Sequence, residues 1–150
     1  MDGISLPLVV LTTLLGLIAV IISWKVETRV KEFFLWLLVL ESSVLGVFCS
    51  LDLLLFFVFW EIEVIPVYFL ISIWGSGNKR YSATKYVIFT LAGSALMLAG
   101  IVSLYYATGS LDMSALAQSG QAMVQSVLPA APIFFLLLAG FAVKLPVVPF

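Results

Sequence analysis

Glu61 carries the strongest indication of chemistry in this sequence. It lies in an apolar stretch, 51–74, that is otherwise interrupted only by Asp52 at its start and by Glu63. A stretch of this length crosses a bilayer as a helix, and a charged side chain near the centre of such a helix costs about 2.5–3.5 kcal/mol on insertion scales. Membrane helices rarely keep such a group without a partner or a water-filled cavity. The default hypothesis for Glu61 is therefore transfer of an ion or a proton.

Two further ionisable residues lie at a similar depth. On a rise of about 1.5 Å per residue, Glu61 lies roughly 14 Å from the outer end of its span, and Glu41 lies roughly 15 Å from the outer end of the preceding span. Lys144 lies roughly 18 Å from the outer end of the last span, counted from Pro132. Two carboxylates and one amine at comparable depth are the components of a proton relay. A static buried ion pair that only fixes helix packing is the alternative, although such pairs are weak indicators of stability.

Glu63 adds a carboxylate that periodicity alone does not place. Two residues turn a helix through roughly 200°, so Glu61 and Glu63 face nearly opposite directions, and the sequence leaves open which of them faces the protein interior. Pro66 has no N–H to donate to the carbonyl of Ile62, so the helix is expected to loosen one turn beyond Glu61. Two prolines that follow Lys144 act in the same way. Irregular backbone beside embedded charges favours a transport function.

Composition predicts the elements that hold these groups. Of the 150 residues 63% are apolar and only 10% are charged, and the mean hydropathy is +1.23. These values lie far from the soluble average and indicate an all-α integral membrane protein. The apolar runs are continuous, and five of them approach or exceed the length of a membrane span. We expect one transmembrane domain over 1–150, with spans at approximately 4–24, 33–50, 51–74, 81–106 and 129–150.

Small residues recur at helical spacing between positions 92 and 103. They predict close approach by a neighbouring helix, because membrane helices use small residues for packing, and we favour that interpretation over a ligand site. The polar connection 108–127 predicts an outer loop, and within it 113–124 is mildly amphipathic.

The distribution of charge predicts orientation. The basic residues outside the last span fall in or beside the loops that follow the first and third spans, while the other face carries none, so the positive-inside rule places the N-terminus outside. The chain contains no histidine and a single cysteine, Cys49. It therefore offers no spacing typical of a metal or iron–sulfur site, and redox centres must lie elsewhere. The basic residues are Lys25, Arg29, Lys31, Lys79, Arg80 and Lys85.

Four motifs stand out along the chain: 46–70 (GVFCSLDLLLFFVFWEIEVIPVYFL), 73–75 (IWG), 83–85 (ATK) and 142–150 (AVKLPVVPF). Together they resemble chain M, or subunit 4, the antiporter-like subunit family of proton-pumping NADH-quinone oxidoreductase (complex I). The likeness extends over essentially the whole chain, and the sequence is most similar to the photosynthetic branch of that family.

The resemblance implies a fold of two inverted five-helix repeats, each with a broken helix. Glu61 would correspond to the essential membrane glutamate of the family and Lys144 to the lysine of the broken helix that pairs with it. Glu41 and Lys85 occupy positions where ionisable residues are common, and they are further candidates for the relay. The chain is expected to be an N-terminal fragment, because it stops inside the helix break before the second repeat.

The resemblance also implies partners and cofactors. NAD(P)H or ferredoxin, iron–sulfur clusters and quinone are expected in partner subunits, and no cofactor is expected in this chain. The partners are other membrane subunits, the lipid bilayer and protons, with no nucleic acid. The expected location is a bacterial plasma membrane or a thylakoid membrane, with the N-terminus outside or lumenal.

Three classes of function remain open from the sequence. A proton-translocating subunit of a NAD(P)H- or ferredoxin-linked quinone oxidoreductase comes first. A subunit of a multisubunit Mrp-type Na⁺/H⁺ antiporter, or of the membrane arm of an energy-converting hydrogenase, comes second, because such subunits share the glutamate and lysine motifs. A purely structural scaffold is third.

Overall fold

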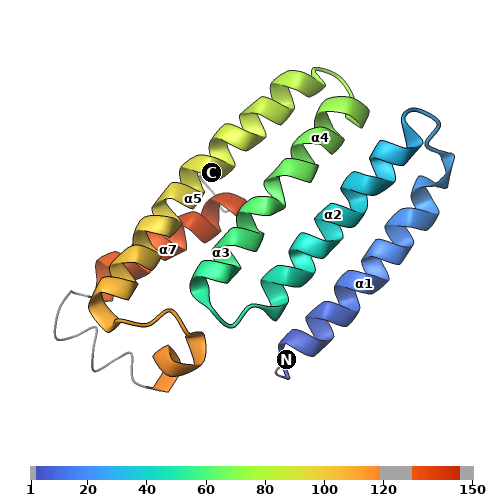
Figure 1. The fold of residues 1–150 in the computed structure, drawn as a ribbon. Coiled ribbons are helices and arrows are strands. Elements are labelled where there is room, and N and C mark those ends of the chain that lie inside the picture. The colour runs from blue at the N-terminus through green and yellow to red at the C-terminus, as the bar shows by residue number, and fades with distance from the viewer. Residues whose placement is uncertain (1–2, 119–129, 146–150) are drawn as a thin grey trace. The chain divides into compact units, whose positions relative to one another are not determined.

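The computed structural model of the protein describes residues 3–118 and 130–145, and helices dominate both ranges (Figure 1). Within them no strand forms, and one isolated bridge pairs Asp52 with Asp112. The elements are α1 (Ser5–Ile22), a 3₁₀ turn η1 (Ser23–Lys25), α2 (Val30–Cys49), α3 (Leu53–Ile62), α4 (Val64–Trp74), α5 (Lys79–Thr108) and α7 (Ala130–Lys144).

Four helical segments of the described chain are long and apolar enough to cross a membrane: Ser5–Lys25, Val30–Cys49, Leu53–Trp74 and Lys79–Thr108. They confirm the all-α, multi-pass prediction, and they overlap the first four predicted spans, whose bounds stay predictions. The fifth predicted span, 129–150, contains α7, whose 15 residues are fewer than the roughly 20 that a complete span needs. Position 129 and positions 146–150 of that prediction lie outside the described residues.

The chain divides into two compact units, one formed by 1–50 and 58–84 and the other by 51–57 and 85–150. The prediction of a single transmembrane domain over 1–150 stays a prediction. In the first unit α1 packs on α2, and α2 packs on α4. Figure 1 shows these three helices side by side.

Close contacts fix the first unit. A Cβ added to Gly46 of α2 would lie 2.5 Å from Cγ of Phe59, so only glycine lets this ring lie against the α2 backbone. Further along, the rings of Trp36 and Phe69 stack with centroids 4.3 Å apart. Because lipid is as apolar as the side chains, such close packing rather than the hydrophobic effect holds membrane helices together. These contacts orient the span that carries Glu61.

In the second unit, α5 packs against α7 through glycines of both helices. A Cβ on Gly93 would lie 2.7 Å from Cβ of Val143, and a Cβ on Gly100 would lie 3.0 Å from Cγ of Leu137. Position numbers rise along α5 as they fall along α7, so the two helices run antiparallel. The prediction that the small residues of 92–103 serve packing is confirmed.

A short junction in the second unit joins the start of α3 to the loop after α5. Backbone bonds of 2.9 Å run from Leu53 N to Leu111 O and from Met113 N to Leu51 O. On one side Asp52 accepts hydrogen bonds from the backbone N–H groups that follow it. On the other side Asp112 caps the helical residues 113–118 in the same way. The described part of the amphipathic stretch 113–124 is therefore helical.

Candidate functional site

Glu61 is the second-last residue of α3, and its Oε1 atom is buried. Among the described residues this atom has no hydrogen-bond partner. A buried polar atom without a partner is costly and usually marks a site of chemistry or a place for water. The burial also fits the prediction that this carboxyl group faces away from lipid.

The contact between Phe59 and Gly46 indicates the directions that the two carboxylates take if the helix is regular. Phe59 lies against α2, and Glu63 follows it by four residues, so Glu63 leaves the helix on nearly the same side. Glu61 follows Phe59 by two residues and leaves on the opposite side, away from α2. Helical periodicity alone left this choice open.

The helix breaks at Glu63, two residues after Glu61. Helix α3 ends at Ile62 and α4 begins at Val64. The bonds around the break are long, with 3.4 Å from Glu63 N to Phe59 O and 3.4 Å from Val67 N to Glu63 O. Pro66 supplies no N–H for the carbonyl of Ile62. The loosening predicted from Pro66 is confirmed, and it leaves backbone groups beside the carboxyl that water can use.

Lys144 is the last residue of α7, and its side chain is half-buried. The contact of Val143 with Gly93 holds this end of α7 on α5. Pro146 and Pro149, which the sequence predicts to loosen the backbone here, lie outside the described residues. Glu61 belongs to the first compact unit and Lys144 to the second, and their pairing stays a prediction.

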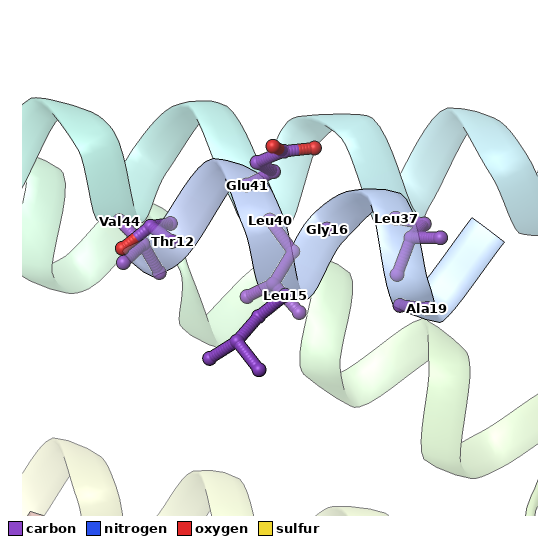
Figure 2. Close-up of a pocket in the computed structure, with 8 residues that line it drawn as sticks. All are labelled: Thr12, Leu15, Gly16, Ala19, Leu37, Leu40, Glu41 and Val44. Atoms are coloured by element: carbon purple, nitrogen blue, oxygen red, sulfur yellow. The ribbon is translucent and has the colours of Figure 1, made fainter. Parts of the chain in front are cut away.

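Glu41 lies in the middle of α2 and meets α1 at a glycine. A Cβ on Gly16 would lie 2.5 Å from Cδ and 2.6 Å from Oε2 of Glu41, so the carboxyl group rests on the α1 backbone. Figure 2 shows this carboxyl beside Gly16, at an open cavity of about 200 Å³ between the two helices. The sequence analysis did not single out Gly16. A glycine inside an apolar helix, where it costs helical stability, was the available signal.

Lys85 is the seventh residue of α5 and is exposed, so the described part of the chain does not enclose its side chain. Ser94 was placed among the packing residues by its sequence pattern, yet its Oγ atom is buried and finds no hydrogen-bond partner in 3–118 or 130–145. Across those same ranges no group of three or more acidic or cysteine side chains is arranged to hold a metal ion.

Comparison with known proteins confirms the resemblance. Residues 50–150 match the family described as NADH:quinone oxidoreductase/Mrp antiporter, transmembrane. The chain is 41% identical over 150 residues to NAD(P)H-quinone oxidoreductase chain 4 1 of Picosynechococcus sp., covering 99% of this chain and 27% of that protein. It shows the same identity and coverage with chain 4 3 of Trichormus variabilis. NADH-ubiquinone oxidoreductase chain 4 of Prototheca wickerhamii is also 41% identical, over 99% of this chain and 28% of its own length.

The chain thus spans little more than a quarter of these relatives. Its helices make it a multi-pass membrane protein, and the match covers well over half of its residues, including Glu61, Lys85 and Lys144. This chain belongs to the NADH:quinone oxidoreductase/Mrp antiporter transmembrane family.

Proposed function

We propose that the chain forms part of a proton-translocating membrane subunit of a NAD(P)H- or ferredoxin-linked quinone oxidoreductase. The observation that carries the proposal is the buried Oε1 atom of Glu61 beside a helix break. The names of the relatives support this class, because all three reported above are chains of quinone oxidoreductases.

In the proposed mechanism Glu61 binds and releases the proton. Desolvation favours the neutral form of a carboxylic acid, whereas a nearby cation favours the carboxylate. Movement of the Lys144 ammonium towards Glu61 or away from it would therefore switch the glutamate between its two forms. Water held by the open backbone beyond Ile62 would carry the proton to and from the carboxyl. Glu41 and Lys85 are further candidate carriers.

The proposal assigns the electron-transfer chemistry to other subunits. NAD(P)H or ferredoxin, iron–sulfur clusters and quinone would be bound there, and this chain would supply proton movement only. The membrane would be a bacterial plasma membrane or a thylakoid membrane. The loops that carry Lys25 and Lys79 would face the cytoplasm or stroma, and the N-terminus would lie outside or in the lumen.

The test is replacement of Glu61 by Gln in the full-length protein within its assembled complex. Gln keeps the size of the side chain but holds no exchangeable acid proton. We expect proton translocation driven by quinone reduction to be lost in sealed membrane vesicles, while the complex still assembles. Glu32→Gln is a control, because that side chain is 52% exposed and lies 3.5 Å from Arg29. Glu63→Gln tests the same substitution on the opposite face and is expected to retain translocation.

Normal translocation by an assembled Glu61→Gln complex would leave the scaffold as the remaining class. Loss of translocation with Glu63→Gln but not with Glu61→Gln would exchange the roles of the two carboxylates and overturn the assignment. Proton movement that requires sodium and needs no electron donor would replace the pump by the Mrp-type antiporter.

A further inference from the structure

Glu41 and Gly16 meet deep inside their helices. Glu41 follows Val30, the first residue of α2, by eleven positions, and Gly16 follows Ser5 of α1 by the same number. At about 1.5 Å per residue, both lie roughly 16 Å from those helix starts. The carboxyl group therefore rests on a neighbouring backbone in the interior of two membrane-spanning helices.

The cavity beside this carboxyl has room for water. Its volume is about 200 Å³, against about 30 Å³ for one water molecule in the liquid. Of the eight residues that line it, only Glu41 and Thr12 carry polar side chains. Thr12 donates its hydroxyl hydrogen to Leu8 O at 2.8 Å, so it offers the cavity an acceptor rather than a donor. The cavity is thus apolar apart from one acid and one hydroxyl oxygen.

No group in the described parts of the chain neutralises a negative charge on Glu41. Neither a hydrogen bond nor an ion pair reaches its carboxyl from 3–118 or 130–145. An unpaired carboxylate is far more costly than a neutral acid where the surroundings are apolar.

We propose that Glu41 is a second proton-binding site of this chain, a carboxyl group that rests on Gly16 within the membrane-spanning part of α2 and opens onto the cavity between α1 and α2. The carboxyl is held between α1 and α2. Helix α4 also packs on α2, and the ionisable group that precedes α4, Glu63, leaves on the α2 side. The site does not depend on Glu61, Lys144 or the proposed pump.

A hydrophobic carbodiimide such as dicyclohexylcarbodiimide tests proton binding at Glu41 directly. It reaches carboxyl groups from apolar surroundings, and its reaction takes up the carboxyl proton. The carboxyl proton moves to one nitrogen of the reagent while a carboxyl oxygen bonds its central carbon, which gives an O-acylisourea. Migration of the acyl group to nitrogen then gives a stable N-acylurea. Every atom of both reactants is retained and no oxidant or reductant is consumed, so the product is an adduct found by peptide mass spectrometry.

The experiment treats membranes that contain the full-length protein in its complex with dicyclohexylcarbodiimide and maps the modified residues. We expect an adduct at Glu41 and none at Glu32, an acid of the same helix that is exposed and paired with Arg29. In Gly16→Leu the new side chain occupies the position of the Glu41 carboxyl and blocks the cavity, so the adduct should be lost. Gly3→Leu is the matched control, because a Cβ at Gly3 meets nothing within 4 Å, and it should leave the adduct unchanged.

Failure of the unaltered protein to form the adduct at Glu41 would overturn the proposal without any variant. Unchanged labelling of Gly16→Leu would overturn the assignment of the cavity. Protection by sodium chloride but not by choline chloride would show an ionised carboxyl that binds a metal cation, and would also overturn it. None of these results depends on translocation by Glu61, so the two proposals fail separately.

Discussion

Replacing Gly93 by Ala should separate α5 from α7. A Cβ at this position would lie 2.7 Å from Cβ of Val143. Ordinary van der Waals contact begins at 3.4 Å, so the two atoms must move apart by at least 0.7 Å. A Cβ is fixed to its backbone and does not rotate away, so one helix must shift as a whole. Overpacking of this kind costs about 1–3 kcal/mol, partly offset by up to about 1 kcal/mol because Ala favours a helix more than Gly.

Gly16→Ala is the matched control for this prediction. It gains the same helical preference, but its Cβ meets only the end of the flexible Glu41 side chain, which is free to move aside. The full-length protein, purified in detergent, is heated, and the fraction that stays in solution gives a melting temperature. Gly93→Ala should melt below Gly16→Ala by about 2–4 °C for each kcal/mol of lost stability. Equal melting temperatures would refute the packing.

A second substitution localises the clash. Val143→Gly removes the Cβ that Gly93→Ala meets, so the double variant should lose less stability than the two single changes together. The difference is a coupling energy, which for residues in contact is about 0.5–3 kcal/mol. Additive effects would mean that the destabilisation arises elsewhere.

Further predictions concern the helix cap at Asp112, the hydrogen bond of Trp74 and the helix break near Pro66. The side-chain and backbone hydrogen bonds from Ser114 lower the pKa of Asp112, so this carboxylate stabilises its loop at pH values above its ordinary pKa of 3.8 and stops doing so as the pH falls through the lowered value. Hydrogen-exchange protection of the Ser114 amide should follow that loss, and Asp112→Asn should remove its dependence on pH. Trp74→Phe keeps an aromatic ring but loses the 2.7 Å bond from Nε1 to Thr28 O, which should cost about 0.5–1.5 kcal/mol in thermal unfolding; an unchanged melting temperature would contradict it. Pro66→Ala restores a backbone N–H at the helix break. The backbone N–H groups of Glu63 and Val67, which now make hydrogen bonds of 3.4 Å, should gain protection from hydrogen exchange. Unchanged protection would mean that the proline does not cause the break.

The sequence predicted the long apolar helices well because a single quantity, the length of apolar chain needed to cross lipid, sets their minimum length. The loosening at Pro66 was also predictable, since a missing N–H has the same consequence in any helix. The last predicted span, 129–150, stays a prediction, because its ends lie outside the described residues; within them α7 covers Ala130–Lys144.

The site was predictable in part. Insertion cost identifies Glu61 and Glu41 as functional candidates without any structure. Helical periodicity gives only relative directions, so it did not tell whether Glu61 or Glu63 faces α2. That choice depends on the contact of Phe59 with Gly46, a fit of shapes between segments distant in sequence. To identify the residue that packs on a given glycine, one must know how each of the two helices is rotated about its axis. The sequence pattern of a single helix does not contain that information.

Glycine serves two purposes in this chain. Gly46 and Gly93 admit a ring and a branched aliphatic group, Phe59 and Val143, and both contacts add dispersion energy that lipid does not replace. Gly16 admits the Glu41 carboxyl instead, which gains little from dispersion and brings a titratable group into an apolar interior. Packing alone does not explain that choice, since an aliphatic side chain at position 41 would fill the same seat at lower cost. An acid at this position, with room for water beside it, is what the proposed proton-binding site at Glu41 needs.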